Sequence, residues 1–369
     1  FQGKRTTTPL PAGRVREAGI VNTIILAACL SIFSLPLWAQ QKPVEGTTYF
    51  LPKTAIRFSL LVEKTTFTPG EYARYAERYM KLPVREDEET TYRIVGCTMS
   101  LFALPDTAKE YKAIIDGKHT VVTLERDENG ILKAINHKGT EIDKPAGFVA
   151  APQKNTVDPH SFMTEEMLSA ASSAKTAELI AREIYDIRDS RNMLSRGEAD
   201  FMPKDGEQLR LMLGQLQTQE QALLQVFAGT TATDTTEHTL TYVPTEEVKD
   251  EVFFRFSKRL GLLDADDLAG EPYYMNVRDL KVIPTLRYDF EEPAKRSKED
   301  IGINVNLPGK IQLTLKGGNQ TLASCELMAA QFGRVENLSA NLFGKKFTTR
   351  LVLNPVTGNV EKIITEPLQ

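Results

Sequence analysis

Residues Ala55–Thr66 read AIRFSLLVEKTT, and this stretch decides the class of the fold. Apolar and polar side chains alternate along it, and it is rich in β-branched and aromatic residues, as a strand with one buried face requires. Asn129 and Gly130 form a typical hairpin turn a little further on. The first third of the chain is therefore predicted to be β-rich, with three further strands at Thr91–Leu104, Thr120–Arg126 and Ile131–Asn136.

One short helix interrupts these strands. Thr68, Pro69, Gly70 and Glu71 have the spacing of a capping box, with proline at the first helical position. This pattern predicts a helix that runs to about Met80.

The period of the apolar residues changes to 3.6 beyond Thr140–His160, a proline-bearing stretch that we interpret as a linker. One long helix is expected from Met163 to Gly197. A second helix is expected to begin at a capping box, Asp205 to Gln208, and to end at Gly229. Two helices joined by a short turn predict an antiparallel hairpin.

Strand patterns return between Glu237 and Leu368. The order of strands, helices and strands favours an α+β fold with antiparallel sheets, sandwich-like or barrel-like, over a parallel βαβ sheet. We expect two β-rich domains with an antiparallel two-helix hairpin between them. The predicted division is a leader at 1–39, an N-terminal β-rich domain with one short helix at 40–145, a linker and helical hairpin at 146–236, and a C-terminal β-rich domain at 237–369.

The leader contains an apolar run, Ile24–Ala39, that follows two arginines and ends in a small residue. This layout is typical of a secretory signal peptide cleaved after Ala39. A membrane anchor is the first alternative, because the run approaches the length of a spanning helix. Lipidation at Cys29 is the second, since Leu26–Cys29 resembles a lipobox. Cleavage after Ala39 predicts an exported protein, periplasmic or on the cell surface, with no membrane span after signal removal.

The bulk composition excludes one class of partner. The formal net charge is -4 and the pI is near 5.8, so no basic field is available for a phosphate backbone. Nucleic acid is therefore not an expected partner. Outside the leader, Cys97 and Cys325 lie in strand-like surroundings and either pair with each other or stay as two buried thiols.

Motifs that carry chemistry are missing from the chain. The four histidines form no zinc-binding spacing, and the sequence contains no GxSxG elbow, phosphate loop or GxGxxG. The acidic cluster Asp264–Asp267 lacks the glycine and the further oxygens of a calcium loop, so we interpret it as the start of a helix. No catalytic residue, metal ligand or cofactor is predicted.

Tyr72, Tyr75 and Tyr79 are spaced to share one side of the short helix. Exposed, such a row suits a sugar-stacking or protein-binding surface, because rigid rings give contact area at small entropy cost. The alternative is that these rings are the buried face of a helix with no other apolar face.

Three segments of the chain have distinctive sequences: Thr68–Tyr79 (TPGEYARYAERY), Gln331–Glu336 (QFGRVE) and Asn354–Gly358 (NPVTG). On these segments, the chain from about Thr47 onward resembles an uncharacterised domain-of-unknown-function family of exported proteins from anaerobic Gram-negative gut bacteria. The resemblance implies no catalytic residue. The resemblance also implies O-glycosylation, which in such bacteria occurs at a threonine that follows aspartate and precedes a small or apolar residue. Thr107 and Thr235 both follow an aspartate in a similar sequence.

Export, β-rich domains and the absence of catalytic motifs together predict a non-enzymatic binding or assembly module of the cell envelope, with a protein or glycan of the envelope as its partner. Strand edges and the tyrosine helix are the candidate surfaces. The alternative is an envelope hydrolase that acts on glycan or peptide, with acid-base carboxylates such as Glu63, Glu77 or Asp264.

Overall fold

The structure is a computed structural model that describes residues 46–114, 120–142, 146–150, 157–203, 205–284, 301–318 and 320–367. The predicted signal peptide, its cleavage site and Cys29 lie outside these residues.

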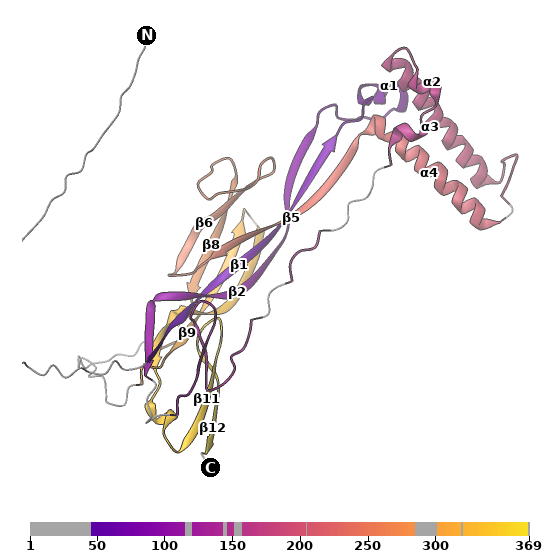
Figure 1. Cartoon of the computed structure of the whole chain (residues 1–369). Coiled ribbons are helices and arrows are strands. Elements are labelled where there is room, and N and C mark those ends of the chain that lie inside the picture. The colour runs from indigo at the N-terminus through magenta and orange to yellow at the C-terminus, as the bar shows by residue number, and fades with distance from the viewer. Residues whose placement is uncertain are drawn as a thin grey trace, which may run out of the picture. The chain divides into compact units, whose positions relative to one another are not determined.

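The alternating stretch at residue 55 is the middle of a much longer strand, β1 (Gly46–Thr68). It lies between β2 (Glu89–Ile114) and β5 (Thr230–Tyr242) in a three-stranded antiparallel sheet of order β2-β1-β5 (Figure 1). Alternate side chains of β1 are fully or almost fully buried from Ile56 to Val62, which confirms the period-two pattern.

A five-stranded antiparallel sheet supplies the other side of this core. Its order is β10-β9-β8-β6-β7. The buried face of β1 shares one hydrophobic cluster with four of these strands, so the two sheets pack through it. The strands are β6 (Val248–Ser257), β7 (Gly261–Leu263), β8 (Glu271–Asp279), β9 (Asn304–Gly317) and β10 (Gln320–Asn337).

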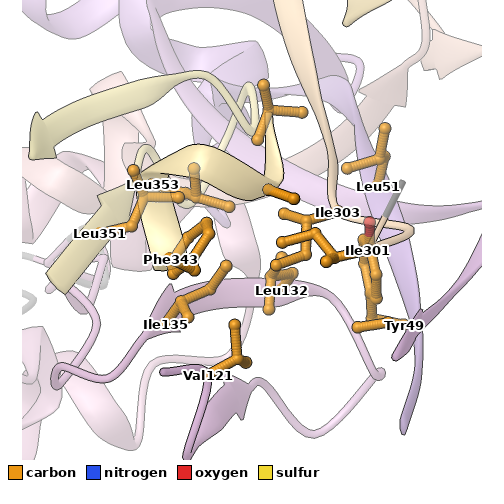
Figure 2. Packing of buried hydrophobic residues seen from close by; sticks show 13 residues of the cluster. Tyr49, Leu51, Val121, Leu132, Ile135, Ile301, Ile303, Phe343, Leu351 and Leu353 are labelled. Atoms are coloured by element: carbon orange, nitrogen blue, oxygen red, sulfur yellow. The ribbon is translucent and has the colours of Figure 1, made fainter. Parts of the chain in front are cut away.

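A third antiparallel sheet, of order β12-β11-β4-β3, joins segments that are far apart in the chain. Its core includes Phe343, from the short helix η3 (Ala340–Phe343), and Tyr49 from the start of β1 (Figure 2). The strands are β3 (Leu124–Arg126), β4 (Leu132–Ile135), β11 (Phe347–Leu353) and β12 (Val360–Pro367).

The helical part contains two long helices that follow β4 in the chain, α3 (Ser173–Arg196) and α4 (Gly206–Ala228), side by side (Figure 1). Short turns precede them. These are η1 (Ala73–Tyr75), α1 (Ala76–Met80), η2 (Pro159–Phe162) and α2 (Glu165–Leu168). Together they bury a third hydrophobic cluster, centred on Ile180, Ile184, Leu223 and Phe227.

Two predictions for the helices are wrong in detail. The expected helix from Met163 to Gly197 is two helices, because the Ser172 side chain accepts a hydrogen bond from Lys175 N and begins α3. The capping box at Thr68 does not form, since Thr68 is the last residue of β1 and the helix begins only after Tyr72. The predicted ends at Gly197 and Gly229 and the N-cap at Asp205 are confirmed.

The predicted fold class is confirmed: the chain is α+β, with antiparallel sheets and a two-helix hairpin between β-rich segments. Strands on either side of the hairpin share sheets, as β4 and β11 do. The predicted domain boundaries stay a prediction.

The two cysteines of the described chain are free thiols, Cys97 on β2 and Cys325 on β10. Both are half-buried, and Cys325 Sγ lies 4.0 Å from Met99 Sδ. Burial raises the pKa of the Cys97 thiol to about 11 and also raises that of Cys325.

Because the thiolate is the reactive form, native Cys97 should react slowly with iodoacetamide at pH 8. A pKa raised by two units lowers the thiolate fraction about a hundredfold, so we expect Cys97 to be alkylated about a hundred times faster in urea than in the folded protein. Mass spectrometry of the peptides that contain Cys97 and Cys325 measures both rates. Equal rates in the two conditions would contradict the partial burial that raises the pKa of Cys97.

Candidate functional site

The tyrosine helix packs inward. Tyr72 is buried against Phe227, with ring centroids 6.5 Å apart, and Tyr75 and Tyr79 are partly buried against the same cluster. Burial raises the pKa of Tyr72, and the neighbouring Glu71 raises it further. The three rings therefore hold the short helix to α3 and α4.

The hydroxyls of the row reach the start of α3. Tyr75 Oη lies 3.2 Å from Ser173 Oγ, and Tyr79 Oη donates to the carbonyl of Ala174 at 3.4 Å. These contacts match the interpretation of the row as a buried face whose hydroxyls reach the rim. Ligand binding at the three tyrosines stays a prediction.

Gly70 brings this corner of the chain into direct contact with the end of α4. A Cβ atom at Gly70 would lie 2.4 Å from the carbonyl oxygen of Val226, and the same carbonyl accepts a hydrogen bond from Tyr72 N at 2.7 Å. Only a glycine permits this approach of two backbones. The segment that reads TPGEY in the sequence therefore anchors the helical hairpin to the end of β1.

The other two distinctive segments meet at a buried polar junction on β1. Its centre is Thr54, which has no exposed surface. The side chain of Gln331 accepts from Thr54 N at 3.0 Å and donates to Thr54 O at 2.7 Å. Thr54 Oγ1 donates to the carbonyl of Val356, in the NPVTG segment, at 3.4 Å. The QFGRVE and NPVTG segments thus fasten the sheets to each other.

A group of titratable side chains surrounds His160. Its Nδ1 lies 3.0 Å from Asp158 Oδ1 and its Nε2 lies 3.7 Å from Glu71 Oε2, beside a cavity of about 410 Å³. Hydrogen bonds from His160 hold the pKa of Asp158 below its ordinary value. Within the described chain no hydroxyl or thiol hydrogen-bonds to His160, so the trio connects η2 to the segment after β1 and lacks the partner of a Ser-His or Cys-His pair.

The carboxylates named for a hydrolase lie on separate elements. Glu63 on β1 forms an ion pair with Arg93 at 2.7 Å, and Glu77 is exposed on α1. Asp264 belongs to a turn after β7, where its carbonyl accepts from Asp267 N, so the acidic cluster is not the start of a helix. Among the described residues no hydrogen bond or ion pair joins these three side chains, whereas glycoside hydrolysis needs a pair of carboxylates that face one substrate.

The two threonines predicted for O-glycosylation lie on strands. Thr107 is exposed on β2, where Asp106 Oδ1 accepts from Ala108 N, and Thr235 is half-buried on β5. Modification at either position stays a prediction.

The end of the hairpin that is away from its buried cluster exposes large apolar side chains. Phe201, in the connection between α3 and α4, is 90% exposed and Leu211 on α4 is 61% exposed. Met193, Met202 and Met212 are each more than 40% exposed. We call these five residues the hairpin tip.

Sequence reasoning missed the hairpin tip because apolar residues at helical spacing predict a buried face. The signal in the sequence is Phe201-Met202 inside the connection, where neither helix can bury it. Large apolar side chains that stay exposed near one end of a pair of helices make that end a candidate interaction surface.

Inside the described ranges, no three or more His, Cys, Asp or Glu side chains are arranged to hold a metal ion. No helix in these ranges has the length and apolar content that crossing a membrane requires.

Comparison with known proteins gives one match. The sequence model of a family described as a domain of unknown function (DUF4831) matches residues 45–361. No curated protein and no solved structure matches the chain.

Proposed function

The chain belongs to the DUF4831 family of proteins of unknown function, and we propose that it is a non-enzymatic binding or assembly module of the cell envelope. The hairpin tip carries this proposal. Large apolar side chains that stay exposed cost solubility, and methionine adapts to partners of different shape.

The chemistry of the tip favours a protein as the partner. The connection 197–205 reads GEADFMPKD, so three acidic residues and one lysine flank Phe201 and Met202. Net negative charge disfavours an anionic membrane surface. It suits an apolar pocket with lysine or arginine at its rim, because charge complementarity at the edge of an interface steers binding.

Export is part of the proposal and is supported by the apolar run Ile24–Ala39 with its preceding arginines. The mass of the mature N-terminus in the native host tests it. Cleavage after Ala39 gives a protein that starts at Gln40, whereas an acylated N-terminus at Cys29 would place the protein on a lipid anchor. An uncleaved leader would contradict export by this route.

The binding role is tested with Phe201→Ser and a matched control. Leu268, in the turn before β8, is 82% exposed and lies outside the hairpin, so Leu268→Ser removes a similar amount of exposed apolar surface. We expect Phe201→Ser to reduce the amount of envelope protein captured by the purified chain about tenfold or more, because central apolar residues dominate interfaces. Leu268→Ser should leave capture unchanged.

Quantitative mass spectrometry of the captured proteins measures both variants, and circular dichroism verifies that each is folded. Equal capture by the wild type and by Phe201→Ser would remove the hairpin tip as the binding surface.

A further inference from the structure

Strand β5 forms an open edge of its sheet, and its pairing with β1 is uninterrupted. It pairs with β1 at all 13 positions from Thr230 to Tyr242 without a register shift, and among the described residues no strand pairs with its other side. Its sequence, TTATDTTEHTLTY, contains no proline or lysine, and its first half is exposed on both faces. Proteins usually protect such an edge with lysine, proline or a bulge, because its unpaired N–H and C=O groups accept another strand.

The sequence of β5 is complementary to itself in the antiparallel direction. Thr236 is the middle residue of the strand, and folding the sequence back on itself at Thr236 matches residues of compatible chemistry. Asp234 comes opposite His238, an acid opposite a base. The other matches are Thr230 with Tyr242, Thr231 with Thr241, Ala232 with Leu240, Thr233 with Thr239, Thr235 with Glu237, and Thr236 with itself.

Threonine pairs and opposite-charge pairs stabilise facing antiparallel strands. A match centred on the middle residue also leaves no part of either strand unpaired. A two-fold axis produces this kind of contact, in which the same patch meets its own copy.

In the described part of the chain, two hydrogen bonds join β5 to elements outside its sheet, one of them from Tyr242 Oη to Glu251 Oε2 on β6 and the other at the open edge. Phe148 N donates to Glu237 Oε2 at 3.3 Å, and no backbone hydrogen bond joins the described residues 146–150 to β5. The same carboxylate accepts from Ser59 Oγ, so it keeps a partner if the contact with Phe148 is lost. A second strand therefore displaces a single hydrogen bond and gains a ladder along β5.

We propose that β5 is a homodimer interface: the β5 strands of two copies pair antiparallel about a two-fold axis at Thr236, which joins two three-stranded sheets into one of six strands. This surface is separate from the hairpin tip, so its test is independent of the proposed function.

Sedimentation velocity of the full chain tests the proposal with Thr236→Lys. The substitution places two lysines opposite each other at the axis, and like charges in that position oppose association. We expect a wild-type dimer and an increase of about tenfold or more in its dissociation constant. Thr98→Lys is the control, because Thr98 is exposed on β2 in the same sheet but not on the β5 edge. It should leave the dimer intact.

A second experiment reports the register. Facing residues of antiparallel strands have Cα atoms about 4.5 to 5.5 Å apart, within the range of a disulfide. Thr236→Cys should therefore give a covalent dimer on mild oxidation, whereas Thr231→Cys should not, because its partner is Thr241. A wild-type monomer at all accessible concentrations would overturn the proposal. So would a dimer that neither Thr236→Lys weakens nor Thr236→Cys cross-links, since it would use another surface or another strand.

Discussion

Replacing Phe343 by alanine is expected to lower the free energy of unfolding by about 3 to 5 kcal/mol. Phe343 has no exposed surface, and its ring lies beside Leu351 and Ile135 of the four-stranded sheet, in the cluster that also contains Tyr49 from the start of β1 (Figure 2). Its carbonyl also accepts hydrogen bonds from the N–H and the hydroxyl of Thr120. The neighbouring chain is thus held in place and cannot close fully over the space that the ring leaves.

Phe347→Ala is the matched control, because Phe347 begins β11 only four residues later and is 46% exposed. It should cost less than about 1 kcal/mol. Urea unfolding followed by circular dichroism measures both values. A loss below about 1.5 kcal/mol for Phe343→Ala would show that the cluster in Figure 2 is not tightly packed.

The sequence predicts the strands well where one face is buried. From Ile56 to Val62 the alternation of β1 follows from a single hydrophobic contact with the facing sheet, so the local pattern reports the tertiary structure. The same holds for the hairpin at Asn129-Gly130, where Gly130 takes a φ of 81°. In both places the sequence pattern has a single physical cause, the buried face of a strand or the backbone conformation of a turn.

The sequence predicts secondary structure less well where contacts with other parts of the fold, and not the local pattern, determine the conformation. The segment Thr230–Thr236 is strand although both of its faces are exposed, because it continues a ladder set by β1 and not by its own apolar pattern. The capping box predicted at Thr68 does not form because β1 continues to Thr68, and no sequence spacing reveals the close contact between Gly70 and Val226 that follows.

For the candidate binding surfaces, too, the sequence predicts the local pattern but not the tertiary contacts. Tyrosines at helical spacing had two interpretations, and only the position of α3 showed that their hydroxyls meet Ser173 and Ala174. Phe201-Met202 is visible in the sequence as an apolar pair inside a connection, but only the structure gives the exposed fraction of Phe201. Periodicity tells which face of an element is apolar, but it does not tell whether another element covers that face.

The distinctive sequences of the QFGRVE and NPVTG segments are explained by the structure. Both meet Thr54, where a buried backbone N–H and C=O at the junction of the sheets have a side-chain partner in Gln331. Buried backbone groups without partners are costly, so such a junction needs an amide at that position.

We therefore expect Gln331→Met to lower the free energy of unfolding by about 2 to 5 kcal/mol. Methionine keeps the length of the side chain but can replace neither hydrogen bond, and Thr54, with no exposed surface, has no access to water. Gln320→Met is the control: Gln320 is exposed at the start of β10, and the change should cost less than about 1 kcal/mol.

Urea unfolding measures both glutamine variants, and hydrogen exchange at the amide of Thr54 separates the local effect from the global one. Faster exchange of this amide in Gln331→Met is expected, because its acceptor is removed. Unchanged stability together with unchanged exchange would mean that the bidentate contact does not hold the sheets together. The distinctive QFGRVE segment would then need a functional explanation at the molecular surface, and Arg334, which is paired with Glu336 beside it, would be the first residue to test.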